Sequence, residues 1–233
     1  IYYFAELSKP QIEKNQEIIR AVEWDSIKKF IKPNSKFLDV GCGSGYSMRK
    51  AKSEFNCKCF GIDPDPGGHG VGRYSKNSTN GLNIIKGYAE KIDLPANSFD
   101  IVYCSHVLEH VNNEENSLKE MSKVLKKDGL LIIGMPTSNM AWLNFYSEIL
   151  FNTHQRIFNF IFGKFPFINT SKTPFINIFL PYSHSSPNAK TILYDLKHYR
   201  VKNWYKIIIS CVFFNSEEKK VVGQKTKKYC VLI

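Results

Sequence analysis

The sequence predicts a doubly wound α/β domain, in which helices cover both faces of a mostly parallel β-sheet. Short apolar runs alternate with helical patterns up to residue 136, as expected for parallel strands joined by right-handed helical crossovers. A glycine-rich turn at 41–45 directly follows the first of these runs. The chain of 233 residues is long enough for one such domain with an elaboration, so we expect a single domain over 1–233.

Each element follows from its local pattern. Residues 10–31 have helical spacing, with Ile12, Ile19, Val22, Ile27 and Phe30 as the expected apolar face, and Pro33 stops the helix. Strands are expected at 36–40, 57–62, 82–86, 99–104 and 130–135, and helices at 44–52, 113–127 and 201–210. The last two strands, 213–222 and 228–233, are joined by a turn at 223–224 and predict an antiparallel hairpin that closes the sheet.

The stretch 138–200 interrupts this alternation with many aromatic residues. Glu148, His154 and Arg156 lie among them, which argues against a membrane span, because a span needs about 20 mostly apolar residues. The main interpretation is a helical insertion packed over the sheet. The alternatives are a cap that binds an apolar substrate and a shallow contact with a membrane surface.

Charge and cysteine content limit the choice of partner and compartment. The net charge is +11, and residues 141–233 carry 13 basic against 4 acidic side chains. This excess permits an anionic partner but does not identify one. No C-x-x-C pair or other zinc-ligand spacing occurs, so no metal is expected. Cys57, Cys59, Cys104 and Cys230 lie in strand-like runs as expected buried thiols, which favours a reducing, cytoplasmic location, with membrane-peripheral attachment as the alternative.

The strongest motif is Phe37-Leu38-Asp39-Val40-Gly41-Cys42-Gly43-Ser44-Gly45, a strand that runs into a helix. Glycines permit close backbone approach to a ligand, and the following helix start favours an anionic group. A dinucleotide fingerprint would need a glycine at Tyr46. Asp39 would oppose a pyrophosphate, but it suits a ligand with both an ammonium and a carboxylate, such as S-adenosylmethionine. Asp63 ends the next strand and is placed to accept ribose hydroxyls.

Three further motifs follow in order: 87–95 with Ala89-Glu90, 105–111 with Ser105-His106 and Leu108-Glu109-His110-Val111, and 125–133 with the Asp128-Gly129 turn. With the glycine loop and Asp63, they cover roughly residues 10–136. Over this range the sequence resembles the class I S-adenosylmethionine-dependent methyltransferases of the type 11 group. The resemblance implies a Rossmann-like seven-stranded sheet with an antiparallel strand near its carboxyl end. It also makes 10–136 the cofactor-binding core. The aromatic-rich insertion at 138–200, which the resemblance does not cover, is then the expected acceptor-binding cap.

The resemblance carries over to individual residues. The cofactor is implied to lie against Asp39, Gly41, Cys42, Gly43, Gly45, Asp63, Pro64, Ala89, Glu90, Ser105 and His106. A hydroxyl acceptor benefits from a base, and histidine is the usual one near neutral pH. His106 is the candidate catalytic residue, with His110, His184 and His198 as alternatives.

The predicted function is therefore transfer of a methyl group to an oxygen or carbon atom of a small, lipid-linked or glycan-precursor acceptor. Three rivals stay open: an RNA methyltransferase, a non-catalytic binding protein of the same fold, and a nicotinamide dehydrogenase. RNA is disfavoured as a partner because the carboxyl-terminal lysines fall on the predicted hairpin. There they are expected to keep a sheet edge solvated rather than to bind RNA; they are Lys219, Lys220, Lys225, Lys227 and Lys228.

Overall fold

The computed structural model describes residues 9–66, 79–136, 138–139, 142–143, 145–146, 197, 200–208, 210–211 and 229–232. By its internal contacts the chain divides into two compact units. One comprises residues 1–134 and 211–233, and the other comprises residues 135–210. The first unit holds the sheet and the predicted 10–136 core up to residue 134. The second unit includes the whole of the predicted insertion, whose role as a cap stays a prediction.

The sheet of the first unit has six strands in the described residues, and all of its pairings are parallel. Its strands are β1 (Lys36–Val40), β2 (Lys58–Asp63), β3 (Ile84–Lys86), β4 (Phe99–Ser105), β5 (Leu125–Gly134) and β6 (Tyr229–Leu232). Their spatial order is β3-β2-β1-β4-β5-β6, so the order reverses between β1 and β4. In open parallel sheets, ligands bind beyond the carboxyl ends of the strands at such a reversal. The predicted doubly wound α/β fold is confirmed.

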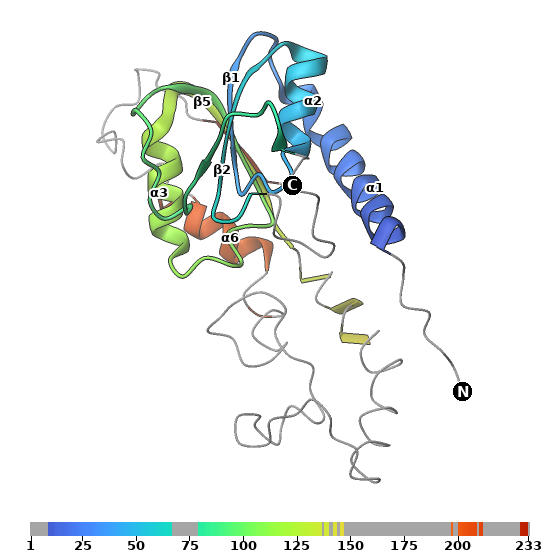
Figure 1. Cartoon of the computed structure of the whole chain (residues 1–233). Coiled ribbons are helices and arrows are strands. Elements are labelled where there is room, and N and C mark those ends of the chain that lie inside the picture. Colours follow the sequence, from blue (N-terminus) through green and yellow to red (C-terminus); the bar gives the residue numbers. More distant parts are fainter. Residues whose placement is uncertain are drawn as a thin grey trace. The chain divides into compact units, whose positions relative to one another are not determined.

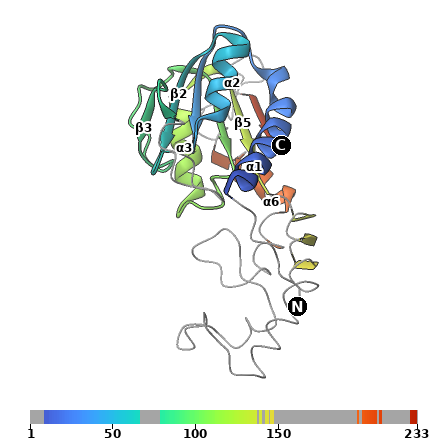
Figure 2. The same cartoon turned by 45° about the vertical axis from the view of Figure 1, so that its right-hand side comes forward.

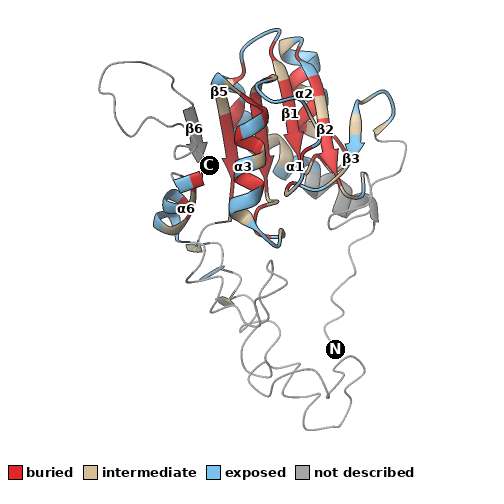
Figure 3. Cartoon of the chain, turned by 90° about the vertical axis from the view of Figure 1, so that its left-hand side faces the viewer, coloured by how far each residue is buried: buried red, intermediate tan, exposed pale blue. Residues whose placement is uncertain are grey.

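Helices cover both faces of this sheet (Figure 1). The helices α1 (Lys9–Ile27) and α2 (Tyr46–Phe55) lie on one face, and α3 (Glu114–Val124) lies on the other. The view in Figure 2 shows β3 at the outer edge beside β2. Strands β1, β2 and β4 are mostly buried, whereas β3 is mostly exposed. Figure 3 shows this contrast for β1, β2 and β3. Sandwiching between helix layers explains why the strand sequences are nearly continuous apolar runs rather than alternating ones.

Local sequence sets the helix ends near the site. Gly45, with a φ of 75°, precedes α2, and Asn56, with a φ of 52°, ends it in the left-handed region. The side chain of Asn113 accepts a hydrogen bond from the Asn116 backbone N–H and caps α3. These residue types at these positions are the usual start and stop signals of a helix.

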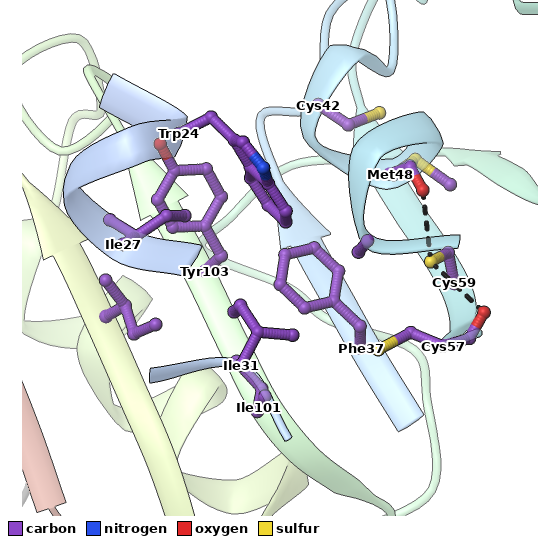
Figure 4. Close-up of a cluster of buried hydrophobic side chains, with 12 residues drawn as sticks. Trp24, Ile27, Ile31, Phe37, Cys42, Met48, Cys57, Cys59, Ile101 and Tyr103 are labelled. Carbon is purple, nitrogen blue, oxygen red and sulfur yellow. Dashed lines mark hydrogen bonds between the residues drawn. The ribbon is translucent and has the colours of Figure 1, made fainter. Parts of the chain in front are cut away.

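The core between α1, α2 and the sheet corrects the predicted face of α1. Trp24 is 2% exposed and packs with Phe37, Tyr103 and other buried side chains (Figure 4). Ile19 and Val22, expected on the apolar face, are 58% and 63% exposed. The indole N–H of Trp24 donates to Glu54 Oε2 of α2 at 2.8 Å, which satisfies the polar end of this large buried side chain. Ile27, also expected on the apolar face, is 1% exposed and lies in the same cluster, so the prediction is confirmed at Ile27 and wrong at Ile19 and Val22.

The last two strands also differ from expectation. β5 begins at Leu125, before the predicted start at 130, and its pairing with β4 is irregular between Phe99 and Ile101. β6 falls within the predicted range 228–233, but it pairs directly and in parallel with β5, so the antiparallel edge expected from this strand is not seen. The other predicted strand, 213–222, lies outside the described residues, and the hairpin and the seven-stranded sheet stay predictions.

The second unit is described in part. The helix α6 (Val201–Ile208) confirms the helix predicted at 201–210. Trp142, Phe145 and Tyr146 form one aromatic cluster, in which the Trp142 and Tyr146 rings stack with centroids 5.8 Å apart. In the described part of the chain, no helix has the length and apolar character needed to cross a bilayer.

Candidate functional site

The reversal of strand order brings the predicted motifs together at one edge of the sheet. The glycine loop follows β1, Asp63 ends β2, and Ser105 and His106 stand at the end of β4. Asp39 lies one residue before the end of β1, opposite Gly61 of β2 and Tyr103 of β4. Residues that are far apart in the sequence thus form one candidate site, as the motif order predicts.

The glycine loop uses its three glycines in two different ways. Gly41, Gly43 and Gly45 all have positive φ, at 78°, 50° and 75°, a conformation that favours glycine. A Cβ at Gly41 would overlap the side chain of Val107, and one at Gly45 would overlap Leu82. A Cβ at Gly43 would meet no atom of the described residues within 4 Å, its two chain neighbours aside. Gly41 and Gly45 therefore allow the protein to pack on itself, while Gly43 faces open space in which a ligand can approach the backbone.

Asp63 holds this loop in place. Its Oδ2 accepts a hydrogen bond from the Gly43 N–H at 2.8 Å, and its Oδ1 accepts one from the Asp65 N–H at 2.8 Å. The residue is 4% exposed. A carboxylate offers about four acceptor positions, so two remain on Asp63 for ligand hydroxyls. The predicted ribose-binding acid therefore also shapes the glycine loop, a role that spacing alone did not suggest.

Asp39 is a buried acid with an incompletely balanced charge. Burial raises the pKa of its carboxyl to about 7, the Arg20 guanidinium of α1 lowers that pKa in part, and Asp63 and Glu23 raise it further. A cationic group at this position would stabilise the ionised form. The ammonium group of an amino-acid ligand has the required charge.

His106 is held at both ring nitrogens. Its Nδ1 lies 3.2 Å from Glu109 Oε1, and its Nε2 lies 3.0 Å from Glu23 Oε1 of α1. Hydrogen bonds with Glu109 and then Glu23 raise the pKa of the imidazole to about 9. The ring is therefore charged at neutral pH and has no free lone pair with which to accept a proton. The prediction that His106 is the catalytic base stays a prediction, and this geometry does not favour it.

Sequence reasoning missed the acidic partners of His106. Glu23 lies in the first predicted helix, where only apolar spacing was considered, and it also accepts a hydrogen bond from Arg20 at 2.7 Å. Glu109 belongs to the recognised Leu-Glu-His-Val step, but it had no assigned role. Its side chain is 4% exposed, and its Oε2 has no hydrogen-bond partner among the residues that the structure describes. An acid at the i+3 position from His106 was the available signal for Glu109.

The other predicted cofactor residues line the same edge. Cys42 is buried, and its N–H donates to the Ile62 carbonyl at 3.2 Å. Ala89 is also buried, and the Glu90 carboxylate accepts from the Asn112 N–H at 3.0 Å. Two further positions complete the set: Pro64 is half-buried directly after β2, and Ser105 is buried beside Gly134.

Two alternative histidine candidates, His184 and His198, lie outside the described residues, as do residues 67–78 beyond Pro64. Five cysteines of the described part of the sheet unit are buried: Cys42, Cys57, Cys59, Cys104 and Cys211. The prediction of buried reduced thiols is confirmed for Cys57, Cys59 and Cys104. Burial raises the pKa of each of these three, so they are packing residues rather than reactive ones.

The arrangement as a whole fits a ligand with a nucleoside at one end and an amino acid at the other. Asp63 offers acceptors for the hydroxyls of a ribose, and Gly43 offers an open backbone. Asp39 offers a negative charge for an ammonium group. S-adenosylmethionine has these parts, so the residues present fit the cofactor that the sequence predicts.

Comparisons with known proteins agree on the domain. Residues 38–133 match the family model described as "Methyltransferase domain". The chain is 30% identical over 112 residues to a ubiquinone/menaquinone biosynthesis C-methyltransferase of Campylobacter jejuni, covering 45% of this chain and 46% of that protein. It is 31% identical over 133 residues to a ubiquinone biosynthesis O-methyltransferase of Pelagibacter ubique, covering 54% and 55%.

A third relative is named for a tRNA nucleotide rather than for a quinone. The chain is 32% identical over 117 residues to a tRNA U34 carboxymethyltransferase of Shewanella frigidimarina, covering 48% of this chain and 35% of that protein. The chain thus spans between about a third and just over half of the length of these relatives. The part of this chain that matches the family model, residues 38–133, carries the glycine loop, Asp63 and His106.

Proposed function

We propose that the chain binds S-adenosylmethionine at the edge of the sheet formed by β1, β2 and β4. It transfers the methyl group of this cofactor to a small, lipid-linked or glycan-precursor acceptor. The proposal starts from residues 38–133, which form a class I S-adenosylmethionine-dependent methyltransferase domain. The observation that carries the proposal is the pairing of an open Gly43 with two buried acids, Asp39 and Asp63, at the ends of adjacent parallel strands. A nucleoside that also carries an amino acid needs this combination.

When bound, S-adenosylmethionine would supply an electrophilic methyl group on its sulfonium, with S-adenosylhomocysteine as the leaving group, and Asp39, Gly43 and Asp63 would hold it. The acceptor releases a proton if it carried one. The protein's task is mainly to position the two partners and exclude water. Asp63 fixes the loop and the ribose, and Asp39 orients the amino-acid end. His106, which is already charged, orders the edge of the site instead of removing the proton.

Two observations support an apolar acceptor. Trp142, Leu143 and Tyr146 of the second unit are exposed, and Trp142 stacks on Tyr146. Clustered exposed aromatic residues are a feature of sites that bind apolar partners. Two relatives are named for ubiquinone biosynthesis, in which the named product is a hydrophobic quinone. An apolar or lipid-linked acceptor fits both observations.

RNA is the second candidate acceptor. One relative is named for a tRNA nucleotide, and residues 141–233 carry 13 basic against 4 acidic side chains. A positively charged surface is the main source of affinity for a phosphate backbone. In this alternative the cofactor site keeps the same residues, and only the acceptor differs.

The test is transfer of a radioactive methyl group from labelled S-adenosylmethionine to a cell extract, followed by separation of lipid, small-molecule and RNA fractions. We expect label in the lipid or small-molecule fraction. Label in RNA alone would support the second candidate and reject the first. Absence of label, together with absence of cofactor binding, would overturn the methyltransferase proposal.

A further inference from the structure

Four charged side chains form a continuous chain from α1 to the segment after β4. Arg20 Nη1 lies 2.7 Å from Glu23 Oε2, Glu23 Oε1 lies 3.0 Å from His106 Nε2, and His106 Nδ1 lies 3.2 Å from Glu109 Oε1. Signs alternate along this chain when His106 is charged. Glu23 is the link between the two elements, because each of its oxygens faces a different cation.

We call these four side chains, Arg20, Glu23, His106 and Glu109, the bridge. The bridge requires a doubly protonated His106 ring. Both nitrogens of an imidazolium donate, whereas a neutral imidazole has one donor and one acceptor. A neutral His106 would turn a lone pair toward either Glu23 or Glu109, and that contact would be repulsive. The bridge therefore holds while the ring is charged and weakens when the ring loses its proton.

The His106 end of the bridge is the fixed end. Its backbone has a φ of 55°, which is uncommon for a non-glycine residue, and its N–H donates to the Gly134 carbonyl of β5 at 3.0 Å. Such conformations persist where the surroundings impose them, and they gather at functional sites. Glu109, buried on the other side, fixes the ring orientation. The other end of the bridge is Glu23 of α1, a helix that also packs on the core through Trp24.

The bridge also stands beside the proposed cofactor position. Arg20 and Glu23 both act on the charge of Asp39, the acid assigned to the cofactor's ammonium group. Val107, next to His106, fills the space where a Cβ at Gly41 would lie. The contact between α1 and the segment after β4 is therefore made at the methionine end of the site.

We propose that Glu23 is a positioning residue, which fastens α1 to His106 and so closes the methionine end of the cofactor site. This inference rests on the proposed function, because it assigns the closed end to S-adenosylmethionine. It explains why a helix that precedes every recognised motif contributes two charged side chains to the site. It also gives His106 a role that does not require a free lone pair.

The groups that face His106 set the pH dependence of this closure. Among the described residues they are Glu23 from α1, with Arg20 beyond it, and Glu109 from the segment after β4. Because the pKa of His106 is raised to about 9 from its usual 6.5, the stabilisation is fully present below about pH 6.5 and is lost as the pH rises through about 9.

The experiment compares Glu23→Gln with Asp25→Asn, a matched control. Asp25 is two residues further along α1 and forms an exposed ion pair with Lys28 at 2.6 Å, so its variant makes the same charge change away from the site. Amide hydrogen exchange of α1 is measured without ligand, and S-adenosylmethionine affinity is measured by calorimetry at about pH 7 and about pH 10. The effect is read as the ratio of variant to wild-type Kd, which cancels any titration of the ligand itself.

We expect Glu23→Gln to speed exchange in α1 and to raise the Kd at about pH 7 roughly tenfold, as for loss of a hydrogen bond to a charged group. The ratio should approach one at about pH 10, while Asp25→Asn stays near wild type at both values. The double variant Glu23→Gln/His106→Gln should add little to the effect of Glu23→Gln alone.

Equal exchange and equal affinity for Glu23→Gln and Asp25→Asn would overturn the inference, as would a tenfold ratio that persists at about pH 10. A wild-type protein that binds no S-adenosylmethionine would reject the proposed function instead. In that case, faster amide exchange of α1 in unliganded Glu23→Gln would still show that Glu23 fastens α1. Unchanged exchange would overturn the fastening as well.

Discussion

The loop after β1 and the segment after β4 meet at the same edge of the sheet, but they differ in how far their groups are already engaged by the protein. The loop after β1 has open space at Gly43 and a backbone held by Asp63. In the segment after β4, the His106 ring nitrogens are both engaged by carboxylates of the protein itself. The first region has open space for a ligand, whereas His106 in the second is engaged with another part of the chain.

This difference separates binding from positioning. Residues with unused acceptor capacity or open space are expected to affect ligand affinity directly. Residues whose partners are already protein groups are expected to act through the arrangement of those partners. Substitutions in the two regions should therefore give effects that differ in kind as well as in size.

The largest effect is expected within the glycine loop itself, for Gly41→Ala. The new methyl group would overlap Val107, and the φ of 78° is strained for alanine. We expect the free energy of unfolding to fall by about 2–4 kcal/mol, measured by urea denaturation without ligand. A fall of less than about 1 kcal/mol would mean that this glycine is not needed for packing between the two regions.

Asp63→Ala should come next and should affect both properties. The Gly43 and Asp65 N–H groups lose their acceptor, which should cost about 1–3 kcal/mol of folding stability. Loss of the ribose contacts should weaken S-adenosylmethionine binding by roughly 100-fold, an effect of about 2.7 kcal/mol. Denaturation and calorimetry on the same variant separate the two costs. Unchanged affinity with reduced stability would limit Asp63 to a structural role.

Asp39→Asn should have a smaller effect, with opposite signs for folding and binding. Because burial raises the pKa of Asp39 to about 7, its charged form costs stability as the pH rises from about 4 through 7. The neutral amide removes that cost, so unliganded Asp39→Asn should be more stable than wild type by at least about 1 kcal/mol at about pH 8, with little difference at about pH 4. Urea denaturation at both pH values measures this.

The same variant should bind S-adenosylmethionine more weakly, since the ammonium group loses its partner. If Asp39→Asn destabilises the unliganded protein at about pH 8, the buried acid is balanced within the protein itself. It would then resemble the segment after β4 rather than the glycine loop.

The sequence allowed prediction of the parts that depend on local pattern. The strands β1, β2 and β4, the glycine loop and Asp63 follow from apolar runs and glycine spacing, which reflect the backbone of each segment. The charged bridge could not be predicted in this way. Glu23 and His106 meet only because α1 packs on the sheet, and no local pattern fixes which face of a helix is turned inward.

The face of α1 illustrates this limit. Ile19 and Val22 have helical spacing, yet Trp24 is buried because Phe37, Tyr103 and Glu54 receive it. The pairing of β6 has the same cause. A short apolar segment predicts a strand, but its direction depends on the neighbour it meets, and here that neighbour is β5.

The central claim is that the open space at Gly43 is the place where S-adenosylmethionine approaches the backbone. Calorimetric titration of the wild type and of Gly43→Ala tests it most directly, because a Cβ at this position meets no atom of the described residues within 4 Å, its two chain neighbours aside. We predict saturable binding to the wild type, and a variant that folds with about 1 kcal/mol lower stability but binds at least about tenfold more weakly. Equal affinity of the two proteins, or no binding to the wild type, would contradict the account.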